Sequence, residues 1–277
     1  MSKALNQYIQ DAGLEVRDGN QIVLPDWVKR VKIDVGLSYS ASNSIHWIRE
    51  DPHLMVFGFE PLLESCDILR NWISKQEDRD KLQSQLIILP AALGQQSGRA
   101  QLHITADDTA SSSLLAPREM EERESITVPV FPLRDLMVSL PWGRIQRVDY
   151  LKLDCQGLDL QILQSTGEAW LEKIAIITAE AEDDQYLDSA NGLFDLVNYM
   201  KSNGFIHLNP RSGLRVYLGK LLSRLSIIRS LEIRLPVKKA KDVASPKLSV
   251  VTEDPTFVNR AFLREVMAGE ITGFQRG

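Results

Sequence analysis

Residues 31–36 read VKIDVG, a short apolar run that ends in an aspartate and a glycine. Such a run is typical of a strand that is buried on both faces and enters a tight turn. Two similar runs follow, MVFGFE at Met55–Glu60 and LIILPAAL at Leu86–Leu93. Helical spacing of apolar residues separates the three runs, over Ala41–Arg49 and Leu62–Lys75. This βαβαβ alternation predicts a parallel sheet with right-handed crossovers.

The alternation is then interrupted and resumes. The runs at Ala100–Thr105 and Ile126–Val130 predict a hairpin inserted over residues 97–130. Four further strands bring the expected sheet to seven: Val148–Leu153, Ile174–Glu180, Phe205–Leu208 and Pro255–Ala261. Helices are expected between them, at Leu133–Leu140, Leu158–Ser165 and Leu193–Asn203. The predicted fold class is α/β, with a Rossmann-like, mostly parallel seven-stranded sheet.

The chain is expected to form one domain over residues 1–277. It is long for a single domain, but no linker is convincing enough to divide it. Residues 1–30 form an N-terminal extension, and residues 211–250 form a basic insertion, expected to be helical, before the last strand.

Composition restricts the partners and the compartment. The net charge is −5, which does not favour nucleic acid as a partner. The two cysteines, Cys66 and Cys155, have no metal-ligand spacing and suit a reducing compartment. There is no signal peptide and no run of eighteen apolar residues. We therefore expect a cytoplasmic protein, at most peripheral to a membrane.

The segment from Arg211 to Lys241 departs from this balance, with nine basic residues and one acid, Glu232. Its leucines favour one helical face, which Arg229 interrupts. Three interpretations stay open: an accessory helix packed on the domain, a docking surface for an anionic acceptor such as a nucleotide sugar or lipid-linked glycan, and a membrane-surface helix.

Two strand ends carry the first functional signal. Asp34 and Gly36 close the first run, where a glycine lets the main chain turn tightly and approach a ligand. Glu60 closes the second run, and a carboxylate there can accept hydrogen bonds from both hydroxyls of a ribose. Together they favour a nucleoside-bearing cofactor. A nicotinamide-dependent dehydrogenase would need G-x-G-x-x-G after the first strand, and this chain lacks it.

At this point the sequence resembles the FkbM family of methyltransferases, over roughly residues 31–261. The most specific piece is VDYLKLDCQGLDLQIL at Val148–Leu163. Seven more pieces occur in the family's order: IDVG at 33–36, FGFEP at 57–61, PAALG at 90–94, LHIT at 102–105, SSSLL at 111–115, NYMKSNGF at 198–205 and DPTFV at 254–258.

The resemblance implies a class I methyltransferase fold with S-adenosyl-L-methionine as the methyl donor. By position, Gly36 would approach the carboxypropyl end of the cofactor and Glu60 would bind its ribose. Ala91 and Ala92 would lie near the adenine. Asp154 would lie close to the path of the methyl group.

One position departs from the family pattern. Members usually carry a second glycine where this chain has Ser40. Serine adopts positive φ only at a cost, so we expect a reshaped turn in which Ser38 and Ser40 contact the cofactor.

Methyl transfer to an alcohol requires an aligned acceptor and a group that takes one proton. Asp154 is the first candidate for this base, although it could instead cap the following helix. Glu180 follows the fifth strand and could face the acceptor. His103 could act from the insertion, although a solvated histidine explains it as well. No metal is expected, because no clustered oxygen-ligand spacing occurs.

The predicted function is methyl transfer to a hydroxyl of a sugar or secondary metabolite, with a small-molecule or glycan acceptor. The alternative is a non-catalytic module that keeps the fold and holds a partner or a membrane surface through its basic segment. The sequence does not give the oligomeric state.

Overall fold

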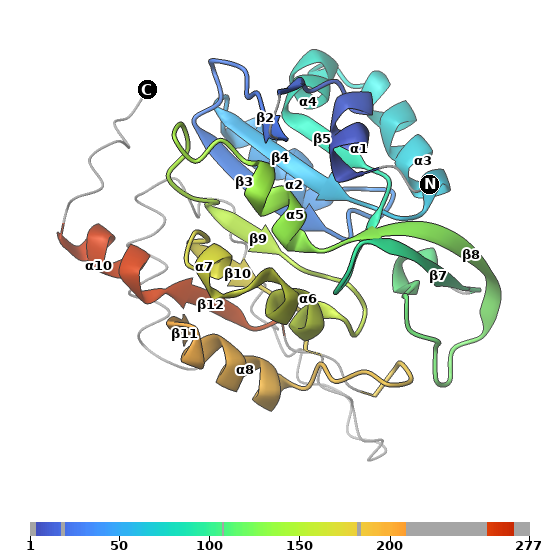
Figure 1. Ribbon diagram of the computed structural model, residues 1–277. Helices are drawn as coiled ribbons and strands as arrows, with labels where there is room; N and C mark the ends of the chain where they lie inside the picture. The colour runs from blue at the N-terminus through green and yellow to red at the C-terminus, as the bar shows by residue number, and fades with distance from the viewer. Residues whose placement is uncertain (1–3, 18–19, 107, 182–183, 209–253, 269–277) are drawn as a thin grey trace, which may run out of the picture.

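The computed structural model describes residues 4–17, 20–106, 108–181, 184–208 and 254–268. Its centre is a seven-stranded sheet in the order β11-β12-β10-β9-β3-β4-β5 (Figure 1). The bounds of these strands are β3 Arg30–Val35, β4 Leu54–Phe59, β5 Leu86–Leu89, β9 Tyr150–Lys152, β10 Ile176–Thr178, β11 Phe205–His207 and β12 Thr256–Asn259.

The sheet is mostly parallel, as the sequence predicted. Strand β3 lies at its centre and pairs in parallel with both β4 and β9. Only β12 runs against its neighbours in this sheet, antiparallel to β10 and to β11. The carboxyl ends of β3, β4, β5, β9 and β10 therefore share one edge, where ligands bind in open α/β sheets.

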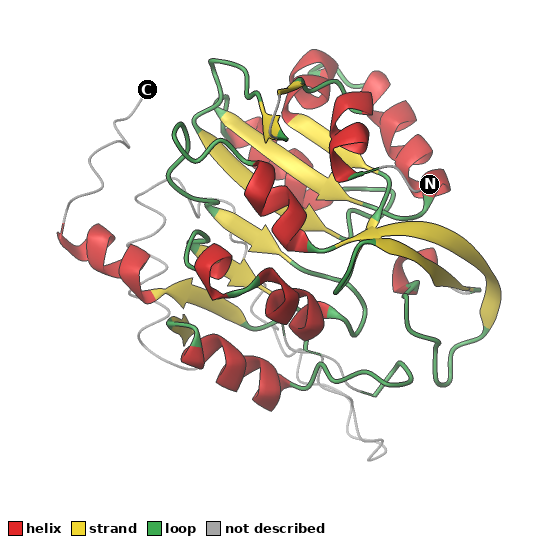
Figure 2. Ribbon diagram, in the orientation of Figure 1, coloured by secondary structure: helices red, strands yellow, loops and turns green. Residues whose placement is uncertain are grey.

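Helices cover both faces of the sheet and give three layers (Figure 2). One face packs on α1 Leu5–Asp11, α5 Leu133–Ser139, α6 Asp159–Thr166, α7 Glu168–Leu171 and α8 Leu193–Ser202. The other packs on α2 Ser42–Glu50, α3 Leu63–Ser74, α4 Arg79–Gln85 and α10 Arg260–Ala268. Alternate residues of β4 supply the two cores: Met55 and Phe57 face the first helical layer, and Leu54 and Val56 face the second.

The third predicted strand, Leu86–Leu93, is wrong as a single element. It divides at Pro90 into β5 and a two-residue strand, β6 Ala92–Leu93, which belongs to a separate sheet. Proline has no N–H to donate to a ladder, so pairing with β4 ends before it. The N–H of Ala91 donates to Leu89 O (2.9 Å), which turns the chain away.

The predicted hairpin insertion is present and forms this second sheet. Strands β7 Gly98–Thr105 and β8 Glu122–Phe131 pair antiparallel, and β6 pairs in parallel with β8. Figure 1 shows the hairpin reaching beyond the edge of the main sheet. A short 3-10 helix, η1 Thr109–Ser111, lies in the loop between the two strands.

Other boundaries also differ from the prediction. The last strand ends at Asn259 and not at Ala261, because the Asn259 side chain accepts the Ala261 N–H (2.9 Å) where α10 begins. Helix α4 was not predicted. In the N-terminal extension, α1 buries Leu5 and Ile9 in the core, and β1 Val16–Arg17 pairs with β2 Gln21–Ile22.

The basic insertion predicted at 211–250 lies outside the described residues. Among the helices that the structure describes, none has both the length and the apolar character needed to cross a bilayer.

Gly36 makes the tightest main-chain approach at the shared edge. Its φ is +82°, and a Cβ built on it would lie 2.3 Å from the main-chain oxygen of Asp154. No side chain fits between the end of β3 and the chain that follows β9, so glycine is required here.

We expect Gly36→Ala to lower the free energy of unfolding by more than about 2 kcal/mol, since a left-handed residue costs roughly 1–2 kcal/mol and the contact adds to it. Urea denaturation measures the change. Gly143→Ala is the control, because a Cβ at Gly143 meets nothing within 4 Å. Equal stability of the two variants would contradict the close approach.

Candidate functional site

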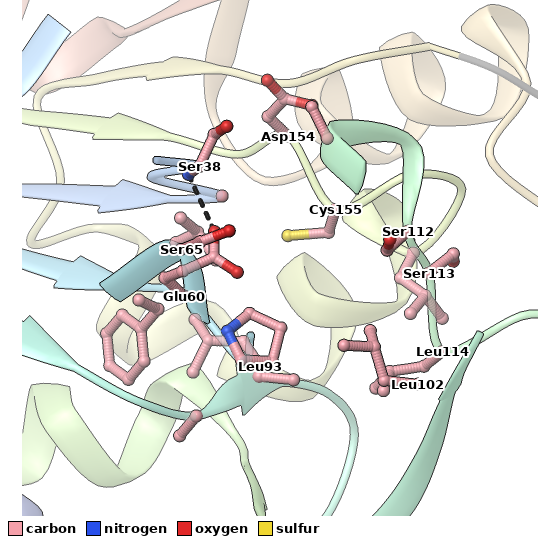
Figure 3. A pocket seen from close by; sticks show the side chains of 18 of the residues that line it. Ser38, Glu60, Ser65, Leu93, Leu102, Ser112, Ser113, Leu114, Asp154 and Cys155 are labelled. Atoms are coloured by element: carbon pink, nitrogen blue, oxygen red, sulfur yellow. Dashed lines mark hydrogen bonds between the residues drawn. The ribbon is translucent and has the colours of Figure 1, made fainter. Parts of the chain in front are cut away.

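A pocket opens at the shared edge between the main sheet and the hairpin (Figure 3). Its empty volume is about 700 Å³, the open mouth included. Its polar lining includes Ser38, Glu60, Ser65, Ser112, Ser113 and Asp154, and its apolar lining includes Val35, Phe59, Ala91, Ala92, Leu93, Leu102, Leu114 and Leu158.

Glu60 follows β4 directly and is 8% exposed. Its Oε2 accepts the N–H of Ser38 (2.8 Å), as Figure 3 shows, and its Oε1 accepts the N–H of Leu62 (2.9 Å). Burial raises the pKa of the Glu60 carboxyl, and these two N–H groups oppose that rise. The two bonds fix the carboxylate at the pocket wall, where each oxygen can still accept a hydrogen bond from a ligand.

The turn after Gly36 bears on the expectation for the serine at position 40. Positive φ falls on Ser38 (54°) and Ala41 (43°), and Ser40 is outside that region. Ser38 lines the pocket, whereas Ser40 is exposed and does not. The structure thus brings Ser38 to the site and leaves Ser40 at the surface.

The far wall of the pocket is apolar and comes from both sheets. Ala91 and Ala92 follow β5, and both are buried. Leu102 of β7 and Leu114 of the hairpin loop, which lie close together in Figure 3, also line the pocket. This wall offers flat apolar surface, of the kind that an aromatic ring buries.

Asp154 follows β9 and is tied to a buried lysine. Lys152 Nζ lies 3.0 Å from Asp154 Oδ2 and 3.7 Å from Asp34 Oδ1. Burial disfavours the ammonium group, but the two carboxylates outweigh burial and raise the pKa of Lys152 above its usual range. The side chain of Asp154 is 40% exposed, so a ligand can reach it. In the first turn of α6, the N–H of Leu160 donates to the Asn191 side chain (2.8 Å), so capping does not explain Asp154.

Asp34 is a supporting group beneath the site. It is 2% exposed, and its Oδ2 accepts the hydroxyl of Ser44 in α2 (2.6 Å). Burial raises the pKa of Asp34. Because Asp34 does not line the pocket, its direct role is to hold α2 and Lys152.

The loop after β9 joins Asp154 to Glu180. The amide nitrogen of Gln156 lies 2.9 Å from Asp154 Oδ1 and 2.9 Å from Glu180 Oε2. Glu180 does not line the pocket, but this bridge places it behind Asp154.

His103 is not brought to the pocket. Its neighbours Leu102 and Ile104 face the core, so the imidazole points the other way and its Nδ1 lies 2.9 Å from Glu122 Oε2. This is the arrangement that strand alternation gives for a histidine on the outer face.

Three side chains of the site were not predicted. Lys152 stands two residues before Asp154, on the same face of the strand, and this spacing was a usable signal. Gln156 has a φ of +51° and Cys155 lines the pocket, and neither feature can be read from residue types alone. Burial raises the pKa of the Cys155 thiol well above its usual range, so this group stays neutral.

The geometry can be compared with known proteins. Residues 26–206 match the family described as the methyltransferase FkbM domain. The chain belongs to the FkbM methyltransferase family. The FkbM match covers the pocket and ends in β11, so β12 and α10 lie beyond it. No curated protein matches the chain significantly.

Three solved structures are similar to this chain. The methyltransferase FkbM from Methylobacillus flagellatus KT is 18% identical, with a TM-score of 0.41 over 71% of this chain; the chain spans 44% of that protein's length. The aminoglycoside resistance methyltransferase NpmB1 is 13% identical, with a TM-score of 0.37 over 89% of this chain and 99% of its own. The methyltransferase domain of bacterial CtHen1-CN is 9% identical, with a TM-score of 0.32; the match covers 68% of this chain and 85% of that one.

Asp159 supports the same loop and gives the fold a pH dependence. Its Oδ1 accepts the N–H of Cys155 (2.9 Å) and its Oδ2 accepts the N–H of Glu180 (2.7 Å). Burial raises the pKa of Asp159 to about 7 from 3.8, although both N–H groups favour the charged form. The folded protein therefore holds this proton more tightly than the unfolded chain, and its contribution to stability is lost as pH rises from 3.8 through about 7.

We expect Asp159→Asn to remove this titration. The stability advantage of the wild type over the variant should shrink between about pH 4 and about pH 7. Urea denaturation of both proteins across that range measures it. An advantage that grows with pH would show that the two N–H groups outweigh burial.

Proposed function

We propose that this FkbM protein is an S-adenosylmethionine-dependent methyltransferase that methylates a hydroxyl oxygen of a sugar or another secondary metabolite. The observation that carries the proposal is the position of Glu60. Its carboxylate is fixed by two main-chain N–H groups at the wall of a pocket that Gly36 and Asp154 also line. A buried carboxylate in that place fits the vicinal hydroxyls of a ribose.

The remaining lining fits the rest of the donor. The turn at Gly36 and Ser38 brings main chain to the pocket without an intervening side chain, where a carboxypropyl group would be held. Ala91 and Ala92 are part of the apolar wall, against which an adenine ring would be buried. When bound, the cofactor would supply a methyl group on a positively charged sulfur.

The chain's own task is to position the acceptor and take its proton. The Asp154 side chain is exposed enough to contact an acceptor, and Lys152 Nζ lies 3.0 Å from its Oδ2. The nearby carboxylate of Glu180 adds negative charge, which would favour a cationic donor. Carboxylates also accept hydrogen bonds from hydroxyl groups, which suits a sugar-like acceptor.

Replacing Glu60 should weaken cofactor binding. We expect Glu60→Ala to raise the Kd for S-adenosylmethionine by at least about tenfold, since hydrogen bonds to a charged group are worth roughly 1.5–3 kcal/mol each. Isothermal titration measures the change. Glu172→Ala, at an exposed position after α7, is the matched control. Unchanged affinity in Glu60→Ala would disprove the ribose placement.

Replacing Asp154 should affect turnover more than binding. Asp154→Asn keeps the size of the side chain but cannot take a proton, so methyl transfer should fall about 100-fold or more while cofactor affinity changes little. The readout is the mass shift of one methyl group in a glycan or metabolite extract incubated with labelled donor. Asp195→Asn, on the exposed side of α8, serves as control.

The same extract experiment separates the enzyme from the alternative. Cofactor binding with no methylated product under any extract would favour a non-catalytic module. Product formed equally by wild type and Asp154→Asn would remove Asp154 from the reaction and leave the methyltransferase assignment intact.

A further inference from the structure

Gln156 connects the groups around the site without lining the pocket itself. Its amide nitrogen donates to Asp154 Oδ1 and to Glu180 Oε2, both at 2.9 Å. Its amide oxygen accepts the hydroxyl of Tyr186 at 2.5 Å. Its main-chain oxygen accepts the hydroxyl of Ser113 at 2.7 Å. One residue thus joins the ends of β9 and β10 to the hairpin loop and to the chain around Tyr186.

These contacts allow only one orientation of the amide. An amide nitrogen has two N–H donors, and each one meets a carboxylate oxygen. A flipped amide would place its oxygen against two carboxylates. The hydroxyl of Tyr186 lies 2.5 Å from the amide oxygen and shares its single proton between this oxygen and Ser111 O (2.7 Å), so the two carboxyl groups are what select the observed orientation. The main chain of Gln156 also has a φ of +51°, a conformation that costs free energy for a residue with a side chain.

The bridge matters because two carboxylates placed this close repel each other. Without a donor between them, the two side chains would move apart. A donated N–H strengthens the hold on each carboxyl oxygen. Among the described residues, the other charged groups near the pair include Lys152, which binds Asp154, and the carboxyl groups of Asp34, Glu60, Asp159 and Asp254.

We propose that Gln156 is a positioning residue that holds the side chains of Asp154 and Glu180 together beside the place where the methyl group would be transferred. This inference rests on the proposed function. A pair of negative charges favours the cationic sulfonium of S-adenosylmethionine over S-adenosylhomocysteine, whose sulfur is neutral. Gln156 would therefore help the site to distinguish the methyl donor from the spent cofactor.

Gln156→Met tests the inference, because methionine has a similar length and cannot donate. We expect the preference for S-adenosylmethionine over S-adenosylhomocysteine, measured by isothermal titration with each compound, to fall about tenfold in the variant, because the two carboxyl groups are no longer held together. Affinity for S-adenosylhomocysteine should stay within about threefold, because its main contacts are at Gly36, Ser38 and Glu60.

Gln164→Met is the matched control, since it makes the same change on the exposed face of α6. A loss of general packing would weaken both compounds equally and leave the preference unchanged. An unchanged preference in Gln156→Met would therefore overturn the proposal. If Gln156→Met does not fold, Tyr186→Phe removes the hydroxyl that contacts the amide oxygen and should lower the preference in the same direction by about threefold; no change there would also overturn it.

A second measurement separates this inference from the proposed function. Carbon-13 spectra of the labelled full chain, recorded with no cofactor, follow the side-chain carboxyl carbons of Asp154 and Glu180. Loss of the bridge should change the chemical shifts of both carbons in Gln156→Met and of neither in Gln164→Met. Such a change in a protein that binds neither compound would refute the proposed function while the pairing by Gln156 stands. Unchanged chemical shifts in Gln156→Met would refute the pairing even if the cofactor binds.

Discussion

The close approach of Gly36 to the main chain of Asp154 is the constraint on which the site depends. It brings the end of β3 against the chain that follows β9 with no side chain between them. The bond from the Ser38 N–H to Glu60 then ties the same turn to the end of β4. Three strand ends are therefore fixed by main-chain geometry, and the pocket is formed before any ligand arrives. Preorganisation of this kind lowers the entropic cost of binding.

The site divides into an apolar side and a strongly charged side. Alanines and leucines from two sheets form the first, around Ala91 and Leu102. The second gathers several carboxyl groups around a single lysine, Lys152. Such a cluster needs donors to be stable, and the structure supplies them as main-chain N–H groups, Lys152 and the amide of Gln156. The contrast between the two sides suits a ligand with an aromatic ring at one end and a positive charge at the other.

Much of this arrangement follows from local sequence. Apolar runs that end in Gly36 and Glu60 place both residues at the same edge, because parallel strands end together. The division at Pro90 was missed because both halves of the run are apolar, and only the change of sheet separates them. The sequence could not show toward which side of its strand the Glu180 side chain points. The bridge through Gln156 joins residues up to 30 positions apart and depends on a positive φ, so it requires the folded chain.

The hairpin loop is hydrogen-bonded to Gln156 and to Tyr186. Ser113 bonds to the main chain of Gln156, and the hydroxyl of Tyr186 lies within hydrogen-bond distance of Ser111 O (2.7 Å) and of the amide oxygen of Gln156 (2.5 Å). Residues of the same loop form part of the pocket wall. A displacement of this wall would therefore also disturb the contacts of Gln156, so the shape of the pocket is coupled to the arrangement of Asp154 and Glu180.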